Sequence, residues 1–126
     1  VRGLKSSFKN NKIKALGNTA KFLNKFTPTN ATWNGHNSSA WKEDILAVNG
    51  FDERMQYGGE DRELGERMFN NGIKSKQIRY SAICLHLDHA RSYVKPEMIQ
   101  TNRAIRNNTK TKRIIKTPFG IEKDSL

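Results

Sequence analysis

Four consecutive residues, Gly58-Gly59-Glu60-Asp61, place two carboxylates directly after two flexible positions. Glycine adopts backbone conformations closed to other residues and lets another molecule approach the main chain closely. A carboxylate that follows such a turn can accept a proton from a hydroxyl held within hydrogen-bond reach. The plain alternative is that Glu60 and Asp61 only complement the dipole at the start of a helix. That alternative leaves the two glycines unexplained, so they favour a reacting carboxylate.

Two histidines, His86 and His89, stand three residues apart and could bind a metal. In a strand, residues three apart face opposite sides, so both could bind one ion only if the chain turns near Asp88. The chain has no second cluster of Cys or His residues to complete a structural zinc site. One histidine ligand is therefore a better prediction than two, and a pair of packing or solvent-facing histidines is the alternative.

Small polar residues and aromatic residues alternate before the first carboxylates of the chain. Gly35 and Asn37 lie between Trp33 and Trp41. Exposed aromatic rings beside small polar residues suit stacking on sugar rings, but tryptophan also belongs in cores. We expect Trp41 in the core and leave Trp33 open between the two roles. The same ambiguity holds for Tyr57, which precedes the glycines.

The clearest predicted helix covers residues 60–70. Its first turn holds the two acids, and Asn71-Gly72 should end it. Its apolar stripe consists of Leu64, Met68 and Phe69, which we expect to be buried.

Other segments carry weaker periodic patterns. A helix over residues 40–50 could be capped by Ser38 or Ser39, with Ile45 and Val48 on the same face as Trp41. Residues 73–89 alternate as in a strand, and Thr32–Trp33 could form a short one. Residues 1–26 predict two short amphipathic helices, interrupted at Gly17-Asn18, or a mobile lid. A last helix should begin at Pro96 and carry Met98, Ile99 and Ile105.

The composition limits the core and the class of protein. Of 126 residues, 35% are hydrophobic, so the core should be thin. No apolar run approaches the roughly 20 residues that span a bilayer. The single cysteine, Cys84, cannot form an internal disulfide, which suits a reducing compartment.

The net charge of +11 lies on the flanks. Residues 1–42 carry eight Lys or Arg and no acid, residues 43–101 eight bases and ten acids, and residues 102–126 seven bases and two acids. Basic flanks are usually solvated, but they also attract anionic lipid or nucleic acid.

Four motifs in order resemble the second half of a glycosyltransferase catalytic domain. They are GHN at residues 35–37, LAVNGFDE at 46–53, GGEDREL at 58–64 and the late histidine in HAR. The resemblance covers Trp33 to Arg91. It is to the family 2 bacterial sugar transferases and, more distantly, to the β-1,4-galactosyltransferases, with their Gly-Gly-Glu-Asp motif. It implies an α/β fold, the C-terminal part of a GT-A (nucleotide-diphospho-sugar transferase) fold, with a mixed sheet flanked by helices.

The resemblance also implies roles for single residues. Asp61 corresponds to the catalytic base and Glu60 to a residue that holds sugar hydroxyls. Gly35 and Asn37 correspond to a loop that lines the donor sugar. Tyr57 and Gly58 correspond to a segment between donor and acceptor, and Gly59 is predicted to bind substrate with them.

The resemblance also implies a bound divalent metal ion. His89 corresponds to a late metal ligand, and His86 lies close enough in the chain to approach the ion. Manganese or magnesium would neutralise the departing diphosphate. Some retaining relatives carry Glu-Asn at the position of Glu60-Asp61, so an ionisable Asp61 favours inversion.

The Asp-x-Asp motif of the family's first half does not occur in this chain. The resemblance therefore predicts a single-domain fragment that lacks the donor half and is inactive alone. Its parts would be a basic helical or loop lead-in (1–32), an acceptor-side core (33–91) and a basic C-terminal helix and tail (92–126).

The predicted function is the acceptor-side portion of an inverting, metal-dependent transferase. It would move a sugar from a nucleotide sugar to a saccharide or glycolipid in bacterial surface polysaccharide synthesis. The expected location is cytoplasmic, with the basic flanks free to contact the inner face of the membrane. One alternative is a non-enzymatic basic module for nucleic acid or anionic surfaces, although the aromatic residues lie mostly away from the basic flanks. A degenerate transferase kept as a scaffold is the other.

Overall fold

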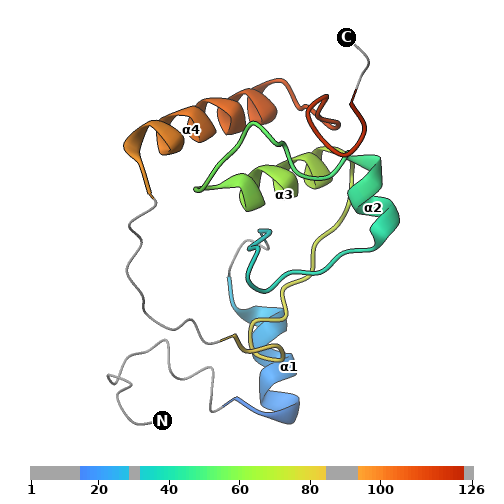
Figure 1. The fold of residues 1–126 in the computed structure, drawn as a ribbon. Helices are drawn as coiled ribbons and strands as arrows, with labels where there is room; N and C mark the ends of the chain where they lie inside the picture. The colour runs from blue at the N-terminus through green and yellow to red at the C-terminus, as the bar shows by residue number, and fades with distance from the viewer. Residues whose placement is uncertain (1–14, 29–31, 85–93, 124–126) are drawn as a thin grey trace. The chain divides into compact units, whose positions relative to one another are not determined.

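The computed structural model describes residues 15–28, 32–84 and 94–123. Within these ranges the chain forms four helices: α1 (Gly17–Phe26), α2 (Lys42–Ala47), α3 (Glu60–Asn70) and α4 (Pro96–Thr111) (Figure 1). The contacts divide the chain into two compact units, one from Val1–Ala31 with Lys76–Leu87 and the other from Thr32–Ser75 with Asp88–Leu126. The three-part organisation expected from the sequence stays a prediction.

The second unit is built on the packing of α3 against α4, which run side by side in Figure 1. Its core is small. Val48, Leu64 and Met68 are buried, and partly buried side chains pack against them: Trp33, Ile45 and Ile73. Trp33 thus contributes to the core. A thin core was expected from the low hydrophobic fraction, and this part of the prediction is confirmed.

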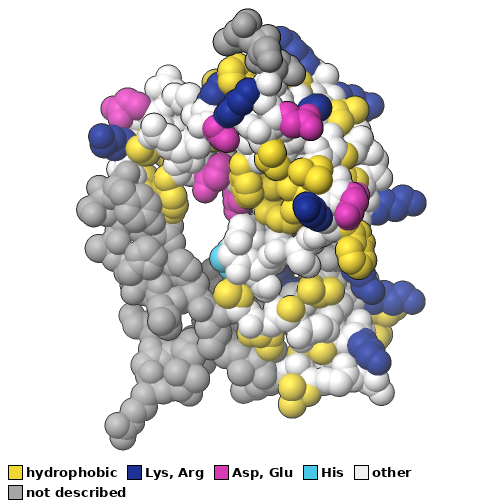
Figure 2. Space-filling view, turned by 45° about the vertical axis from the view of Figure 1, so that its right-hand side comes forward, with side chains coloured by type: hydrophobic (Ala, Val, Ile, Leu, Met, Phe, Trp, Pro, Cys, Tyr) yellow, Lys and Arg dark blue, Asp and Glu magenta, His cyan; other side chains and the backbone are white. Residues whose placement is uncertain are grey.

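Many large hydrophobic side chains are left on the surface. Figure 2 shows hydrophobic side chains exposed among Lys and Arg side chains on one face of the molecule. The exposed large hydrophobic residues are Leu16, Phe22, Phe26, Trp41, Leu46, Phe51, Phe69, Ile78, Ile83, Ile115, Phe119 and Ile121. None of the helices in the described ranges has the length and apolar character needed to cross a membrane.

Helix α3 has the predicted bounds, but its buried face differs from the predicted one. Leu64 and Met68 are buried, as expected, whereas Phe69 is 76% exposed, so its predicted burial is wrong. The buried face continues instead through Glu63 and Arg67, which lie one turn apart. An ion pair satisfies both charges there, and the face turns Phe69 outward.

Helix α2 is shorter than predicted and is not capped by serine. Its N-cap is Trp41, and no side chain caps it. Ser38 instead closes a turn, because its Oγ accepts from Asn34 N at 2.8 Å and donates to Asn34 O at 2.7 Å. Trp41 is 79% exposed, so its predicted place in the core is wrong. The helix ends before Asn49 and Gly50, where φ becomes positive (65° and 69°).

Helix α4 begins at Pro96, as predicted, because proline fits the first turn of a helix and needs no donor there. Ile99 and Ile105 are half-buried along it. The most deeply buried positions of the helix are polar: Asn102 and Thr109.

The described residues contain no strand, and their only β-type pairing is an isolated bridge between Phe119 and Lys123. Residues 73–84, the described part of the predicted strand, have no neighbouring strand to complete a ladder, and residues 85–89 lie outside the described ranges. The mixed sheet is therefore not seen in this part of the chain.

In the first unit, α1 packs against the turn that follows residue 77. Asn24 accepts from Tyr80 N at 2.8 Å and donates from Nδ2 to Ser81 Oγ at 2.7 Å. One backbone group of the predicted strand, Tyr80 N, is thus satisfied by a helix side chain. The predicted break at Gly17 is in fact the first residue of α1, and the helix expected before it lies outside the described residues.

Candidate functional site

The turn before α3 has the unusual backbone that its two glycines permit. Gly58 has a φ of +116°, and Gly59, the N-cap of α3, has a φ of +96°. Both values lie in a region that other residues rarely adopt. Glu60 Oε2 accepts a hydrogen bond from Gly58 N at 2.6 Å, so the first carboxylate of the motif folds back onto the turn and stabilises it.

Asp61, the second carboxylate, contacts the turn that contains Gly35. Its Oδ2 accepts from Gly35 N at 3.0 Å, and its Oδ1 accepts from Arg62 N at 2.7 Å. A Cβ on Gly35 would lie 3.4 Å from Asp61 Cβ, so glycine allows this close approach. The structure thus brings together two predicted site residues that are far apart in the sequence.

Two other predicted substrate-binding residues, Asn37 and Tyr57, lie close to this contact in the chain. Asn37 N donates to Asn34 O at 2.9 Å, which closes the same turn around Gly35. Tyr57 is half-buried immediately before the two glycines. Their roles toward a sugar stay predictions.

Helix α4 fills the space beside the glycines. A Cβ on Gly58 would stand 2.3 Å from Ile99 Cδ1, and one on Gly59 would stand 3.1 Å from Arg106 Cδ. The glycines therefore allow α4 to pack closely against the turn. This packing accounts for them without a gap for a substrate on that side.

Two residues of α4, neither of them predicted from the sequence, hold the turn and helix α3. Asn102 is 1% exposed, and its Nδ2 donates to Gln56 O at 3.1 Å and to Gly58 O at 3.2 Å. Arg106 forms an ion pair with Glu66 of α3, with Nε 3.3 Å from Oε2.

A buried ion pair ties α3 to its surroundings. Arg67 Nη2 lies 2.8 Å from Glu63 Oε2, and the two side chains are 0% and 1% exposed. The Arg67 guanidinium also donates to the carbonyls of Val48 and Gly50. Thr109 Oγ1 of α4 donates to Glu63 Oε1 at 2.8 Å. One network therefore joins α3, α4 and the start of the NGFDE segment.

The NGFDE segment, residues 49–53, is clamped by the chain after α4. Asn49 Nδ2 donates to Thr117 O at 2.7 Å and to Glu122 O at 2.9 Å, and its Oδ1 accepts from Glu122 N at 2.7 Å. A Cβ on Gly120 would lie 1.7 Å from Asn49 O, so only glycine fits there. Within the described residues, the NGFDE segment therefore has a structural role: it holds the chain that follows α4.

Asp52 in the same segment is buried and held by charged and polar donors. Burial alone would raise the pKa of Asp52, but hydrogen bonds from Arg54 and Thr117 and the charge of Arg54 hold that pKa below its ordinary value of 3.8. Arg54 Nη2 lies 2.7 Å from Asp52 Oδ2, and the guanidinium stacks on the Phe119 ring, 3.9 Å from its centroid. Asp52 is thus an ionised structural anchor.

The metal prediction concerns residues outside the described ranges. No group of three His, Cys, Asp or Glu side chains able to hold an ion converges within those ranges. The two predicted ligands, His86 and His89, lie outside them. The described residues alone therefore do not form a metal centre.

Comparison with known proteins identifies one family. The model of the family described as the N-terminal domain of galactosyltransferase matches residues 19–90, more than half of the 126 residues. The match includes every predicted site residue and ends before α4. Because the description names an N-terminal domain, it does not confirm that these residues form the second half of a catalytic domain. No curated protein and no solved structure matches the chain.

Proposed function

The chain belongs to the family described as the N-terminal domain of galactosyltransferase, and from that premise we propose that it supplies the acceptor side of an inverting sugar transfer. The observation that carries the proposal is the hydrogen bond from Gly35 N to Asp61 Oδ2. It joins two segments that the resemblance assigns to the donor sugar and to the base. The family supports a glycosyltransferase, and the assignment of steps to residues is our proposal.

In the proposed mechanism, Asp61 is the general base. Its carboxylate accepts the proton of an acceptor hydroxyl while that oxygen bonds to the anomeric carbon of the donor. The bond from this carbon to the nucleotide diphosphate breaks, the diphosphate leaves with the bonding electrons, and the configuration inverts. A carboxylate can accept about four hydrogen bonds. The two backbone donors on Asp61 orient it and leave acceptor positions for the hydroxyl.

The neighbouring residues take supporting roles in this proposal. Glu60 holds sugar hydroxyls through the oxygen that is not bonded to Gly58 N. Gly35 and Asn37 line the donor sugar, and Tyr57 lies between donor and acceptor. The tight turn that Asn34 and Ser38 close gives Gly35 a fixed position.

A divalent cation, Mn²⁺ or Mg²⁺, is part of the proposal, with His89 and also His86 as ligands. When bound, such an ion would neutralise the charge of the leaving diphosphate. His89→Ala should then weaken the Mn²⁺-dependent binding of a nucleotide sugar. Unchanged binding, measured by calorimetry with and without Mn²⁺, would contradict the ligand assignment.

The proposal extends to the fold and the biological role. We propose a GT-A fold with a mixed sheet, and a nucleotide-sugar donor with a saccharide or glycolipid acceptor of a bacterial surface polysaccharide. An experimental structure of a transfer-competent protein that contains these residues would test the fold. Transfer assays with a panel of nucleotide sugars would test the donor.

The decisive experiment is Asp61→Asn in a transfer-competent protein that contains these residues. General-base catalysis contributes about 10²–10⁴-fold to rate, so the turnover should fall by that factor while nucleotide-sugar binding is retained. Asp44→Asn on α2 is the matched control, because it removes a carboxylate outside the site and should leave turnover unchanged. Normal turnover of Asp61→Asn would refute the base assignment.

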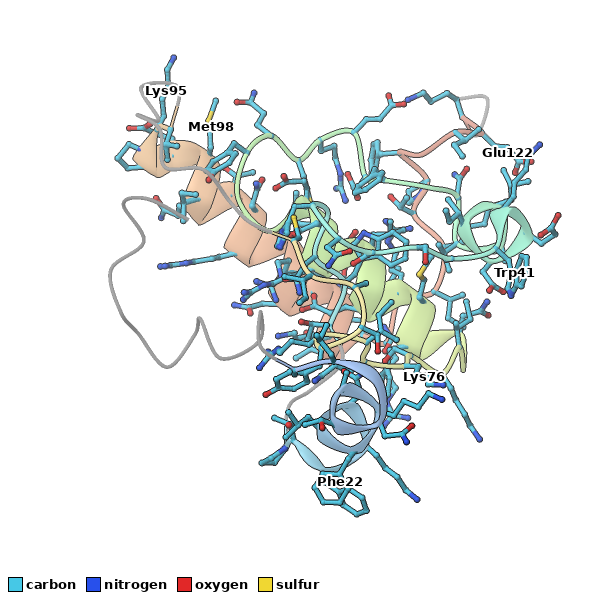
Figure 3. The ribbon with its side chains drawn as sticks, turned by 90° about the horizontal axis from the view of Figure 1, so that it is seen from below. Phe22, Trp41, Lys76, Lys95, Met98 and Glu122 are labelled. Carbon is cyan, nitrogen blue, oxygen red and sulfur yellow. The ribbon has the colours of Figure 1, made fainter. Side chains whose placement is uncertain are left out.

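We also propose that α1 contacts anionic membrane at the inner face. Phe22 and Phe26 are 60% and 59% exposed, and their ring centroids are 4.6 Å apart. Lys25 Nζ lies 5.4 Å from the Phe26 centroid, and α1 contains no acid. Figure 3 shows Phe22 directed away from the axis of α1. Adjacent aromatic and lysine side chains on one helix face suit the interface of an anionic bilayer.

Vesicle binding tests this contact. The chain should sediment with phosphatidylserine-containing vesicles and lose this binding in Phe22→Ser/Phe26→Ser. Phe69→Ser is the control, since Phe69 is an exposed phenylalanine on another helix. Equal binding of the double variant would exclude α1 as the contact. Binding to duplex DNA with a steep salt dependence would instead support the nucleic-acid alternative.

A further inference from the structure

A surface hollow of about 240 Å³ lies between the segment before Tyr57 and the N-terminal half of α4. Gln56, Lys95, Glu97, Met98, Thr101 and Asn102 line it, together with Arg54. Figure 3 shows Lys95 and Met98 together at this end of α4. The volume is below the roughly 300–1,000 Å³ of pockets for drug-sized ligands, so it suits one small ring.

The charges around the hollow favour a neutral ligand. Arg54 is already paired with Asp52. Within the described ranges, Lys95 and Glu97 form no ion pair, and their opposite charges cancel. A hydroxyl both donates and accepts hydrogen bonds, so it can bond to an ammonium, a carboxylate and an amide in turn. A phosphate would gain from Lys95 but would be repelled by Glu97.

Asn102 connects the hollow to the turn before Asp61. It lines the hollow and donates from Nδ2 to the carbonyls of Gln56 and Gly58. Its Oδ1 is buried and receives no hydrogen bond from the described residues. Buried polar atoms nearly always have a partner, so this enclosed acceptor calls for a donor such as an ordered water.

From the size and the balanced charge of the hollow, we propose that it is the subsite for one sugar residue of the acceptor. Met98 offers an apolar surface to the ring, and Gln56, Glu97 and Thr101 supply groups for its hydroxyls. This inference rests on the proposed function, since it places the acceptor of the same reaction beside Gln56, in the segment that leads to Asp61.

The test is a binding experiment on the isotope-labelled 126-residue chain. Methyl glycosides of glucose, galactose and N-acetylglucosamine are titrated at millimolar concentrations and followed by NMR. At least one of them should shift the side-chain amide signals of Gln56 and Asn102. Glu97→Gln and Thr101→Val each alter one hydrogen-bonding group and should weaken binding about 2- to 10-fold. Both positions are exposed, so neither variant should disturb the fold.

Gln100→Ala provides the control, because Gln100 lies on the same helix but lines a different hollow and should leave the affinity unchanged. No shift with any glycoside, or equal affinity in Glu97→Gln and Thr101→Val, would overturn the subsite. Shifts with inorganic phosphate and not with the glycosides would also overturn it. Binding requires no transfer, so these outcomes are independent of the result for Asp61→Asn. Loss of the base assignment with intact sugar binding would refute the proposed function alone.

Discussion

Arg67→Leu should lower the free energy of unfolding by about 3–5 kcal/mol, because it breaks a buried ion pair and leaves the partner charged. Arg67 and Glu63 are 0% and 1% exposed, so solvent does not screen the pair. After the substitution, Glu63 retains only the hydrogen bond from Thr109 among the side-chain contacts of this network. The carbonyls of Val48 and Gly50 lose their Arg67 donors as well.

The size of the effect can be judged against the whole domain. Each buried polar group left without a partner costs about 1–3 kcal/mol, which places the loss at the upper end of the range. Domains of this size are stable by about 5–15 kcal/mol, so a third or more of the total would be lost. In Glu63→Leu/Arg67→Leu no charge is left unpaired. The double variant should therefore be more stable than Arg67→Leu.

Urea unfolding followed by tryptophan fluorescence measures this in a Trp41→Phe background. Trp41 is exposed, so its removal leaves Trp33, which packs against the core, as the reporter. Arg62→Leu is the control on the same helix, because Arg62 is exposed. A loss under about 1 kcal/mol for Arg67→Leu, or additive losses in the double variant, would refute the reasoning.

Two further predictions concern the turn before α3 and the NGFDE segment. Gly58→Ala should lower the free energy of unfolding more than Gly72→Ala does. Both glycines have positive φ, but only a Cβ on Gly58 would meet a neighbour, at 2.3 Å from Ile99 Cδ1. Equal losses of stability in urea unfolding would exclude the clash. For Asp52, the lowered pKa gives stability that is present above the ordinary value of 3.8 and is lost as the pH falls through the folded-state value. Asp52→Asn should be less stable than the parent at neutral pH, and its stability should fall less below about pH 4. Urea midpoints measured against pH test both expectations. An unchanged profile would count against the anchor role.

The bounds of α3 and the start of α4 could be predicted because local chemistry sets them. Proline at the first turn and Asn71-Gly72 after the last one act within a few residues. The buried faces could not be predicted to the same degree. Glu63 and Arg67 have the i, i+4 spacing typical of a solvent-exposed pair. Only the carbonyls of another segment and a hydroxyl from α4 make that pair suitable for burial. Phe69 lies off this buried face and is exposed.

In the candidate site, too, the features set by contacts between distant segments could not be predicted from local sequence. Gly35 and Asp61 could be connected beforehand only through the resemblance, since nothing in their spacing indicates contact. The contribution of Asn102 depends on where α4 packs, which no local pattern specifies. The prediction of a strand over residues 73–89 failed for its described part because alternation describes a segment that could pair, whereas a strand also needs a partner.

The packing of α4 changes what the two glycines imply for catalysis. Ile99 and Arg106 occupy the space beside Gly58 and Gly59, so a sugar does not approach Asp61 through that space. Asp61 itself is oriented from another segment, by Gly35 N. We therefore place the acceptor in the hollow lined by Gln56 and Asn102, where Asn102 Nδ2 donates to the Gln56 carbonyl. It follows that Gly58→Ala should impair transfer only as far as it displaces α4, whereas Asp61→Asn should impair transfer in a protein that stays folded.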